Sequence, residues 1–281
     1  MLVAANKKNN FKVVLVITYA ILILGVLATI GPFLWMILTS FKTQSEAMRI
    51  LPILFPSNWH FDNYMVIFEK LPFGKIYLNT IISSVVTVVA QLLFCSMSAY
   101  AFGRIEFPGR NVIFLALLAV LMVPSSFFLL PQYLIIQKVG LLNTIPALFM
   151  PNLFSAFGTF LLRQFFISLP DELEDAAKLD GCNHFRIYSR IMLPLIKPGL
   201  TALGILSFKF SWNDLMWPLI VNTSTDKMTL SAGLSYLQGQ YSTDYPAIMG
   251  GAFLSMLPLL IMFAVFQKQF IEGIALTGIK D

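Results

Sequence analysis

The chain has 281 residues, of which 57% are hydrophobic and only 12% are charged. Soluble domains carry about 25% charged residues, and a mean hydropathy of +0.77 would leave large apolar surfaces exposed in a water-soluble fold. The composition excludes a disordered protein and a disulfide scaffold, and it argues against a soluble enzyme. The net charge of +5 is spread over the segments between apolar runs, so it indicates membrane topology rather than nucleic-acid binding.

Six apolar runs are long enough to cross a bilayer, because a spanning helix needs about 20 mostly apolar residues. The predicted spans are 13–38, 76–102, 112–136, 145–162, 200–220 and 246–266. The first follows a basic segment, 1–12, and is too long for the core of a signal peptide. We expect a retained anchor that is kinked at Gly31-Pro32. The sequence therefore predicts an all-α polytopic membrane protein with a membrane domain over 13–266 and a tail over 267–281.

The distribution of Lys and Arg predicts the orientation of these spans. With the N-terminus inside, twelve basic residues lie in cytoplasmic segments, six lie outside, and Lys209 falls within a span. This bias predicts that both termini are cytoplasmic. The same orientation places the long segment 41–75 and the polar segment 221–245 outside.

Cysteine and histidine residues are too scattered to suggest a metal site. Cys95 lies in an apolar run and Cys182 in a polar loop, and His60 and His184 are far apart in the sequence. We therefore expect neither a disulfide nor a bound metal ion.

The loop 163–198 carries the most informative pattern in the chain. Ser168 and Pro170 predict a helix start, and four acids follow where a helix dipole favours them: Asp171, Glu172, Glu174 and Asp175. Gly181 predicts a turn, and a second, basic helix is expected over 183–192, ending at Pro194. The pair would form a rigid projection from the membrane.

Two interpretations of this projection are open. Amphipathic helices can lie on the lipid surface, and the basic second helix would suit that position. Clustered acids are repelled from anionic headgroups by about 1 kcal/mol per charge. We therefore favour docking to another protein.

The spacing of the loop also resembles a known family signature. Asp175-Ala176-Ala177, Gly181, Ile191 and Leu193-Pro194 match the EAA motif of ABC importer permeases. The surrounding sequence resembles the carbohydrate branch, and in particular the smaller permease of maltose-type transporters. Supporting stretches are Ser40-Phe41-Lys42-Thr43, Asn63-Tyr64, Ala99-Tyr100-Ala101-Phe102, Phe107-Pro108-Gly109-Arg110, Trp212-Asn213, Trp217-Pro218-Leu219, Phe270-Ile271-Glu272-Gly273 and Gly278-Ile279-Lys280. Asp175 departs from the family's usual Glu, which shortens the side chain by one methylene.

The resemblance implies a type I ABC importer permease fold with six spans, which imports a carbohydrate into a bacterium across the plasma membrane. It implies that loop 163–198 couples this subunit to a separate ATPase through Glu174, Asp175, Ala176, Ala177, Gly181, Ile191, Leu193 and Pro194. No G-x-x-x-x-G-K-S/T motif occurs in the chain, so ATP and Mg are expected on the ATPase. The implied partners are a second homologous permease, two ATPase subunits and an extracytoplasmic sugar-binding protein, with no cofactor on this chain.

Polar residues within the spans suggest a translocation path. Intramembrane polar groups normally face a cavity or a partner, and the candidates are Lys209, Asn213, Gln91 and Asn152. In the alternative interpretation these side chains are structural and hydrogen-bond neighbouring helices. For Asp214 we favour the structural role. The family resemblance further implies that the outer segment contacts the binding protein through Asn222, Thr223, Tyr236, Gln238 and Gln240.

The sequence lacks the features that other classes of membrane protein need. A secondary transporter or channel would need an internal repeat and paired intramembrane ionisable residues. A membrane enzyme would need a cluster of catalytic groups, and the acids of loop 163–198 have only His184 nearby. A third alternative is a scaffold subunit without a translocation pathway. It would differ from a transporter subunit only in that the polar residues of its spans line no cavity.

Overall fold

The computed structural model describes residues 2–238 and 243–278, with side chains for 14–238 and 243–267. The described part is helical, and its β-structure is limited to one isolated bridge between Gln238 and Thr243. The chain divides into two compact units. The first unit comprises Met1–Lys70 and Leu237–Leu254, and the second comprises Leu71–Tyr236 and Ser255–Asp281.

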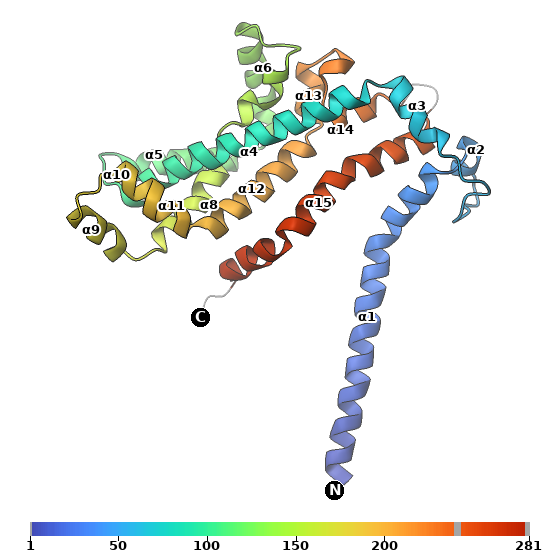
Figure 1. Ribbon diagram of the computed structural model, residues 1–281, viewed down its shortest axis with the longest axis horizontal. Coiled ribbons are helices and arrows are strands. Elements are labelled where there is room, and N and C mark those ends of the chain that lie inside the picture. Colours follow the sequence, from blue (N-terminus) through green and yellow to red (C-terminus); the bar gives the residue numbers. More distant parts are fainter. Residues whose placement is uncertain (1, 239–242, 279–281) are drawn as a thin grey trace. The chain divides into compact units, whose positions relative to one another are not determined.

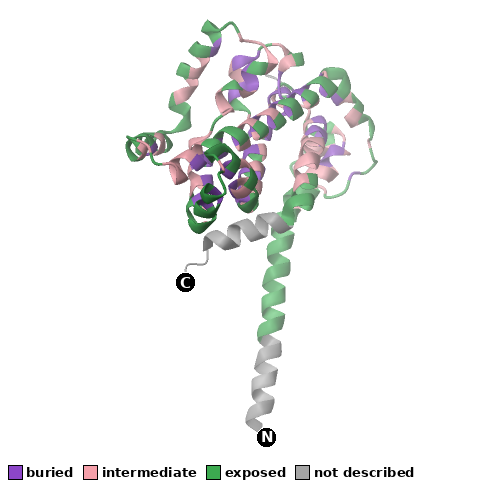
Figure 2. Cartoon of the chain, turned by 60° about the vertical axis from the view of Figure 1, so that its left-hand side comes forward, coloured by how far each residue is buried: buried purple, intermediate pink, exposed green. Residues whose placement is uncertain are grey.

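The first unit is dominated by helix α1 (Leu2–Ser40), which continues through Pro32. Its segment Val14–Ser40 has a mean hydropathy of 2.5 and buries none of its most apolar window within the chain. Figure 2 colours most of residues 14–40 of this helix as exposed. Such a helix is suited to a lipid or a protein partner rather than to water.

The segment 40–64 folds against the end of α1 and is called the clip. It contains two of the short stretches that resemble the family, 40–43 and 63–64. Asn63 donates its amide to the carbonyls of Ser40, at 2.9 Å, and Lys42, at 2.8 Å. The Tyr64 hydroxyl lies 2.8 Å from that of Ser40. Buried Lys42 donates to the Ile53 carbonyl. The clip thus ties the end of α1 to helix α3 (Asp62–Lys70).

Helix α2 (Gln44–Ala47) begins with a capping box inside the same clip. Glu46 accepts hydrogen bonds from the backbone amides of Thr43, at 2.9 Å, and Ser57, at 3.0 Å. The Ser57 hydroxyl and these two amides lower the pKa of Glu46 to about 2. Burial lowers the pKa of Lys42, and the Glu46 carboxylate partly offsets that effect. The clip therefore favours an ionised carboxylate at position 46.

The second unit is built around helix α4 (Phe73–Arg104), which runs the length of the unit (Figure 1). Helices α8 (Ala156–Ile167) and α12 (Lys197–Trp212) pack along it. The buried face of α4 is rich in small and polar residues: Asn79, Thr80, Ser83, Ser84, Thr87, Gln91, Cys95, Ser96, Ala99 and Tyr100. Small side chains allow helix backbones to approach closely, which is typical of packing inside membranes.

Most of the remaining helices are short, and several of them meet at sharp angles. Helices α5 (Arg110–Ala119) and η1 (Val120–Met122) meet η2 (Ser125–Phe128) and α6 (Leu129–Lys138) at an angle of 102°. Helices α7 (Ile145–Phe149) and η3 (Met150–Asn152) meet α8 at 47°. Helices α13 (Met216–Val221), η5 (Thr225–Lys227) and α14 (Leu230–Ser235) follow α12, and α15 (Tyr245–Gly278) ends the described chain.

Three predicted spans are not continuous helices. The run 145–162 breaks between η3 and α8. The run 112–136 breaks at Pro124, because proline lacks a backbone donor and pushes the preceding Val123 into an extended conformation. The run 200–220 breaks after Trp212, where Asn213 ends α12 and Asp214 accepts a hydrogen bond from the amide of Trp217.

The number of spans follows from how these breaks are counted. Among the described residues, three helices are long and apolar enough to cross a membrane. The count is six if each of three bent pairs is one span, the third pair being His184–Leu195 with α12.

Acidification should loosen the clip of the first unit. A carboxylate with a lowered pKa stabilises the fold above its ordinary value of 4.5, and that contribution is lost as the pH falls toward about 2. Hydrogen exchange at the Thr43 and Ser57 amides, normalised to intrinsic rates, should therefore accelerate over this range. In Glu46→Gln the same amides should show lower protection and no such pH dependence. Equal profiles in both proteins would contradict this account.

Close packing at Gly158 gives a second prediction. A Cβ at this position would lie 2.9 Å from Leu203 Cδ1 and 3.2 Å from Cys95 Sγ, so Gly158→Ala should destabilise the chain by about 1–3 kcal/mol. Gly74→Ala is the matched control, because a Cβ there meets nothing within 4 Å in its helix. Alanine should stabilise that site by about 0.5–1 kcal/mol. Thermal unfolding in detergent measures both, and equal melting temperatures would refute the packing argument.

Candidate functional site

Loop 163–198 forms two helical segments joined by a tight turn. The first is α9 (Glu172–Leu179) and the second runs through α10 (His184–Arg186), the π-helix η4 (Ile187–Met192) and α11 (Leu193–Leu195). The Gly181 amide donates to the Lys178 carbonyl, and the Cys182 amide to the Ala177 carbonyl. This is a Schellman motif, in which a glycine with positive φ ends the helix. Gly181 has φ +74°, so the predicted turn is confirmed.

The start of the first predicted helix and the end of the second differ in the structure. Ser168 ends α8 instead of starting α9, and the next helix begins only at Glu172. The second segment starts with Asn183, whose side chain caps the Arg186 amide at 2.9 Å, and it continues past Pro194 to Leu195. Proline is tolerated here because it follows a π-helical segment, in which the regular hydrogen-bond ladder is already interrupted.

The inner face of the loop is buried against the membrane helices. Ala177, Ile187, Tyr188, Met192 and Ile196 share one core with Cys95, Ala99 and Tyr100 of α4, Leu162 and Phe166 of α8, and Leu203 of α12. Among the predicted coupling residues, Glu174 and Ala177 are buried in this interior and Ile191 and Leu193 pack at its margin. The loop is therefore held as a rigid body on the second unit.

The outer face of the loop is acidic and apolar. Asp175, Ala176, Gly181 and Pro194 are exposed. Leu179 is 90% exposed and Phe185 is 67% exposed, and these two residues flank the turn. Neither residue is in the set predicted from the sequence, although two large apolar residues in a polar loop are a signal of a contact surface. The predicted coupling set thus divides into anchoring residues and outward residues.

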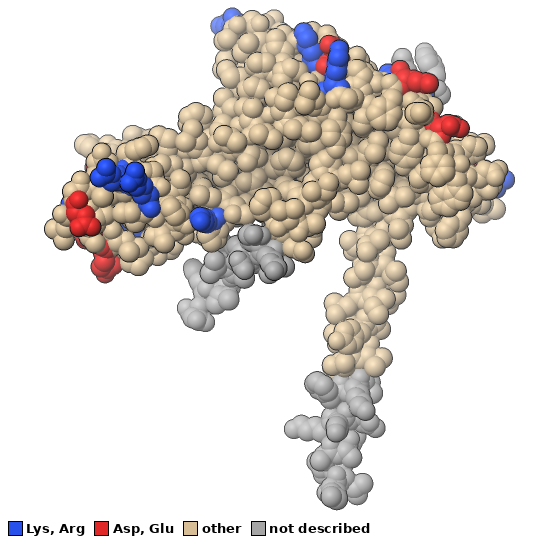
Figure 3. Space-filling model, viewed as in Figure 1, with Lys and Arg blue, Asp and Glu red and all other residues tan. Residues whose placement is uncertain are grey.

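Charged groups concentrate at this end of the second unit. Figure 3 shows acidic and basic side chains gathered around α9 and α10, next to a largely uncharged surface over the membrane helices. Lys178 lies 3.4 Å from Glu174 and 3.8 Å from Asp175. His184 Nδ1 lies 3.9 Å from the Glu174 carboxylate. Glu174 therefore faces inward with Lys178 and His184 beside it, while Asp175 keeps 72% of its side chain exposed.

The polar residues of the predicted path separate into two groups. Gln91 is 7% exposed; it donates to the Asn152 carbonyl at 2.7 Å and accepts from the Ser207 hydroxyl at 2.6 Å. These bonds tie α4 to η3 and α12, which corrects the prediction that Gln91 lines a path. Lys209 and Asn213 are exposed, and the Asn213 amide donates to the Lys209 carbonyl at 2.8 Å. Their role in a path stays a prediction.

The residues predicted to contact a binding protein also fall into two groups, one buried and one exposed. Asn222 is fully buried and donates to the carbonyls of Thr144, at 3.2 Å, and Lys227, at 2.5 Å. Its side chain is used within the chain, which corrects the prediction for this residue. Thr223, Tyr236 and Gln238 are exposed, and Gln240 lies outside the described residues.

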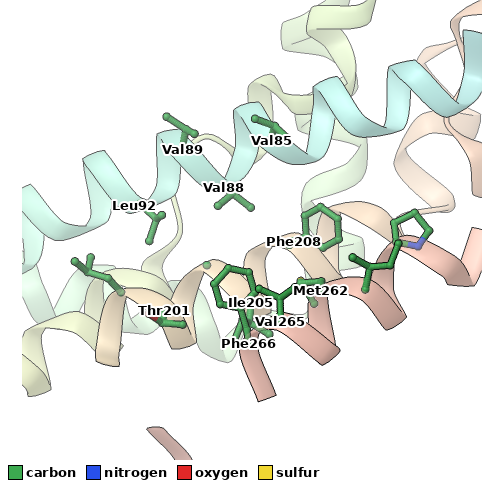
Figure 4. Close-up of a pocket in the computed structure, with 14 residues that line it drawn as sticks. Val85, Val88, Val89, Leu92, Thr201, Ile205, Phe208, Met262, Val265 and Phe266 are labelled. Carbon is green, nitrogen blue, oxygen red and sulfur yellow. The ribbon is translucent and has the colours of Figure 1, made fainter. Parts of the chain in front are cut away.

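A pocket of about 590 Å³ lies between α4, α12 and α15 (Figure 4). Its lining includes Val88, Ile205, Phe208 and Met262, and Thr201 is the one polar side chain among its fourteen lining residues. A site for a small polar ligand needs several placed polar groups. The pocket is therefore suited to hydrocarbon and does not provide a sugar site. No group of three or more metal-ligating side chains occurs in the part of the chain that was described.

The chain matches a known protein family. Residues 92–270 match the family described as "Binding-protein-dependent transport system inner membrane component". The chain belongs to this family. It is 39% identical over 252 residues to the arabinooligosaccharides transport system permease protein AraQ of Halalkalibacterium halodurans, covering 89% of this chain and 90% of that protein. It is 35% identical over 270 residues to the diacetylchitobiose uptake system permease protein NgcG of Streptomyces coelicolor, covering 95% and 88%.

A solved structure has the same fold as this permease. It is that of a bacterial ABC transporter involved in import of the acidic polysaccharide alginate, with a TM-score of 0.78, 23% sequence identity, and coverage of 91% of this chain and 95% of that chain. The predicted all-helical ABC permease fold is therefore confirmed. The permease is a membrane-embedded transporter component rather than an enzyme, and its family works in complexes with partner subunits and a binding protein.

Proposed function

We propose that this permease is one membrane subunit of a bacterial ABC importer for a carbohydrate, and that loop 163–198 is its contact with a separate ATPase. The loop carries the proposal, because its inner face is fixed in the core while its outer face exposes acidic and apolar side chains. A rigid element that protrudes from the membrane can transfer the movement of a partner into the membrane helices.

The substrate class rests on the relatives. AraQ, NgcG and the lactose transport system permease protein LacG of Rhizobium radiobacter are named for oligosaccharides or a disaccharide. A relative named for sn-glycerol-3-phosphate, UgpE of Pectobacterium atrosepticum, is 30% identical. Since the three relatives named for sugars are 32% to 39% identical and UgpE is 30% identical, an oligosaccharide is the proposed cargo and a phosphate ester is the competitor to be tested.

The proposed complex contains a second, homologous permease, two ATPase subunits that bind ATP and Mg, and an extracytoplasmic sugar-binding protein. The permease lies in the plasma membrane with both termini in the cytoplasm, which puts loop 163–198 on the ATPase side. The exposed apolar length of α1 supports a partner in the membrane. Thr223, Tyr236 and Gln238 are available for the binding protein, and Lys209 and Asn213 for the path.

Removing the apolar contacts of the outer face should weaken ATPase docking. Leu179→Ser and Phe185→Ser delete exposed side chains, so the fold should persist. Interface anchors contribute about 1–2 kcal/mol or more each, so retention of the ATPase on the tagged complex should fall about tenfold. Leu51→Ser is the control, because Leu51 is 83% exposed in the first unit. Unchanged retention in both loop variants would overturn the docking assignment.

The cargo is tested with the same complex in proteoliposomes. ATP hydrolysis should rise when the binding protein is loaded with an oligosaccharide. Stimulation by an amino acid or a phosphate ester, with none by oligosaccharides, would overturn the substrate class and leave the docking result intact.

The turn at Gly181 should be required for coupling. Side chains at φ +74° are strained by about 1–2 kcal/mol, although a Cβ there would meet nothing within 4 Å. Gly181→Val should therefore distort the loop and lower sugar uptake per ATP hydrolysed, whereas Gly181→Asn should retain coupling because Asn tolerates this conformation. Gly140→Val is the control, since Gly140 has φ +75° and is equally open. Normal coupling in Gly181→Val would refute the role of the turn.

A further inference from the structure

Helix α4 holds loop 163–198 along one face of its C-terminal end. Ser96, Tyr100 and Arg104 are spaced at i, i+4 and i+8, so their side chains lie in one row. The Arg104 side chain is 5% exposed. Its guanidinium donates to the carbonyls of Phe166 and Leu169 at the end of α8, and it pairs with Asp171 before α9. Arg104 thus joins α4 to the start of the loop.

The other two side chains of the row reach deeper parts of the loop. The Ser96 hydroxyl lies 2.7 Å from the hydroxyl of Tyr188 in the π-helix η4. The Tyr100 ring packs against Phe166 and Tyr188, with centroids 5.6 and 5.5 Å apart, and Ala177 of α9 lies in the same buried core. All of these side chains are more than nine-tenths buried. Both helical segments of the loop are therefore attached to α4.

The N-terminal end of α4 holds the segment 222–230 in the same manner. Asn79 donates to the carbonyls of Asp226, at 2.9 Å, and Met228, at 3.0 Å. The hydroxyl of Thr80 accepts from the Leu230 amide at 2.7 Å. Asn79 and Thr80 are buried. This segment includes Thr223, which we propose for contact with the binding protein, so both partner-facing segments of the second unit are bonded to one helix.

The helix between these two ends is suited to transmit a displacement. It is continuous over 32 residues and contains no proline. At 1.5 Å per residue, Thr80 and Arg104 are about 36 Å apart along the axis. Gln91 anchors its middle to η3 and α12. By contrast, the three bent pairs turn by 47° to 102°, and a bend absorbs movement that a straight helix would pass on.

We propose that α4 is the relay between the two partner contacts of this subunit, with Thr80 and Asn79 as positioning residues at one end and Ser96, Tyr100 and Arg104 at the other. The relay rests on the proposed function, because it assumes that loop 163–198 docks on an ATPase. Docking of the loaded binding protein shifts segment 222–230, α4 moves with it, and loop 163–198 is displaced on the ATPase. Energetic coupling then passes through one packed element with two arrangements.

Conservative substitutions on α4 test the relay in the assembled importer in proteoliposomes. Thr80→Val and Ser96→Ala each remove one hydroxyl that bonds a partner-facing segment. Thr87→Val and Ser84→Ala are matched controls, because both hydroxyls are on the same buried face and have no hydrogen-bond partner among the described residues. The readouts are ATPase-subunit retention, basal ATP hydrolysis, and the stimulation of hydrolysis by sugar-loaded binding protein.

Each relay variant should lower the stimulation by about two- to thirty-fold, as expected for residues in a coupling network. ATPase retention should stay unchanged, and the two controls should match the wild type. Distant sites that act independently add their effects, so the double variant Thr80→Val/Ser96→Ala decides the mechanism. A relay predicts that the double variant loses no more than the stronger single variant.

Additive losses, or normal stimulation in both single variants, overturn the relay while the wild-type complex still shows docking and stimulation. A wild-type complex that retains no ATPase overturns the proposed function, and the relay fails with it. If Thr80→Val lowers the melting temperature of the chain, Asn79→Leu replaces it at the same end of α4. Asn111→Leu, at an exposed position on α5, is then the control.

Discussion

Close packing on one face of α4 is the contact on which the second unit depends. Hydrophobic burial drives little association inside a bilayer, so helices are held by van der Waals contact and hydrogen bonds between close backbones. Small and hydroxyl side chains line that face, and Gly158 and Gly199 bring α8 and α12 close to their neighbours. The same face continues beyond the packed helices, where Tyr100 and Arg104 receive loop 163–198. Packing in the membrane and positioning of the loop therefore use one surface.

The bends in the other helices are compatible with a membrane because their free polar groups find partners nearby. Backbone donors and acceptors in lipid must be satisfied within the protein. Gln91 bonds the Asn152 carbonyl next to the break before α8, and the Trp217 indole bonds the Ala147 carbonyl of α7. Asp214 and Asn213 cap the break between α12 and α13. Gln91, which the sequence suggested for a transport path, is thus part of the scaffold that makes bent helices possible.

The separation of inner and outer faces supports the proposed contact of loop 163–198 with a separate ATPase. Glu174 and Ala177 fix α9 to the body, whereas Asp175, Leu179 and Phe185 remain exposed. Adjacent residues in one motif therefore face opposite sides, because a helix turns neighbouring side chains by about 100°. The motif combines a buried anchor and an exposed surface within two turns.

Sequence alone determined the membrane class, the helical fold, the family and the position of loop 163–198, because hydropathy, charge and motif spacing are properties of consecutive residues. Even the turn at Gly181 followed from local backbone chemistry. Only the tertiary structure decided which polar residues are available, since burial depends on helices that are distant in the chain. Asn222 and Gln91 are examples: each amide is occupied by carbonyls or hydroxyls from other segments. The exposure of Leu179 and Phe185 and the two-ended bonding of α4 likewise arise from contacts that periodicity cannot encode.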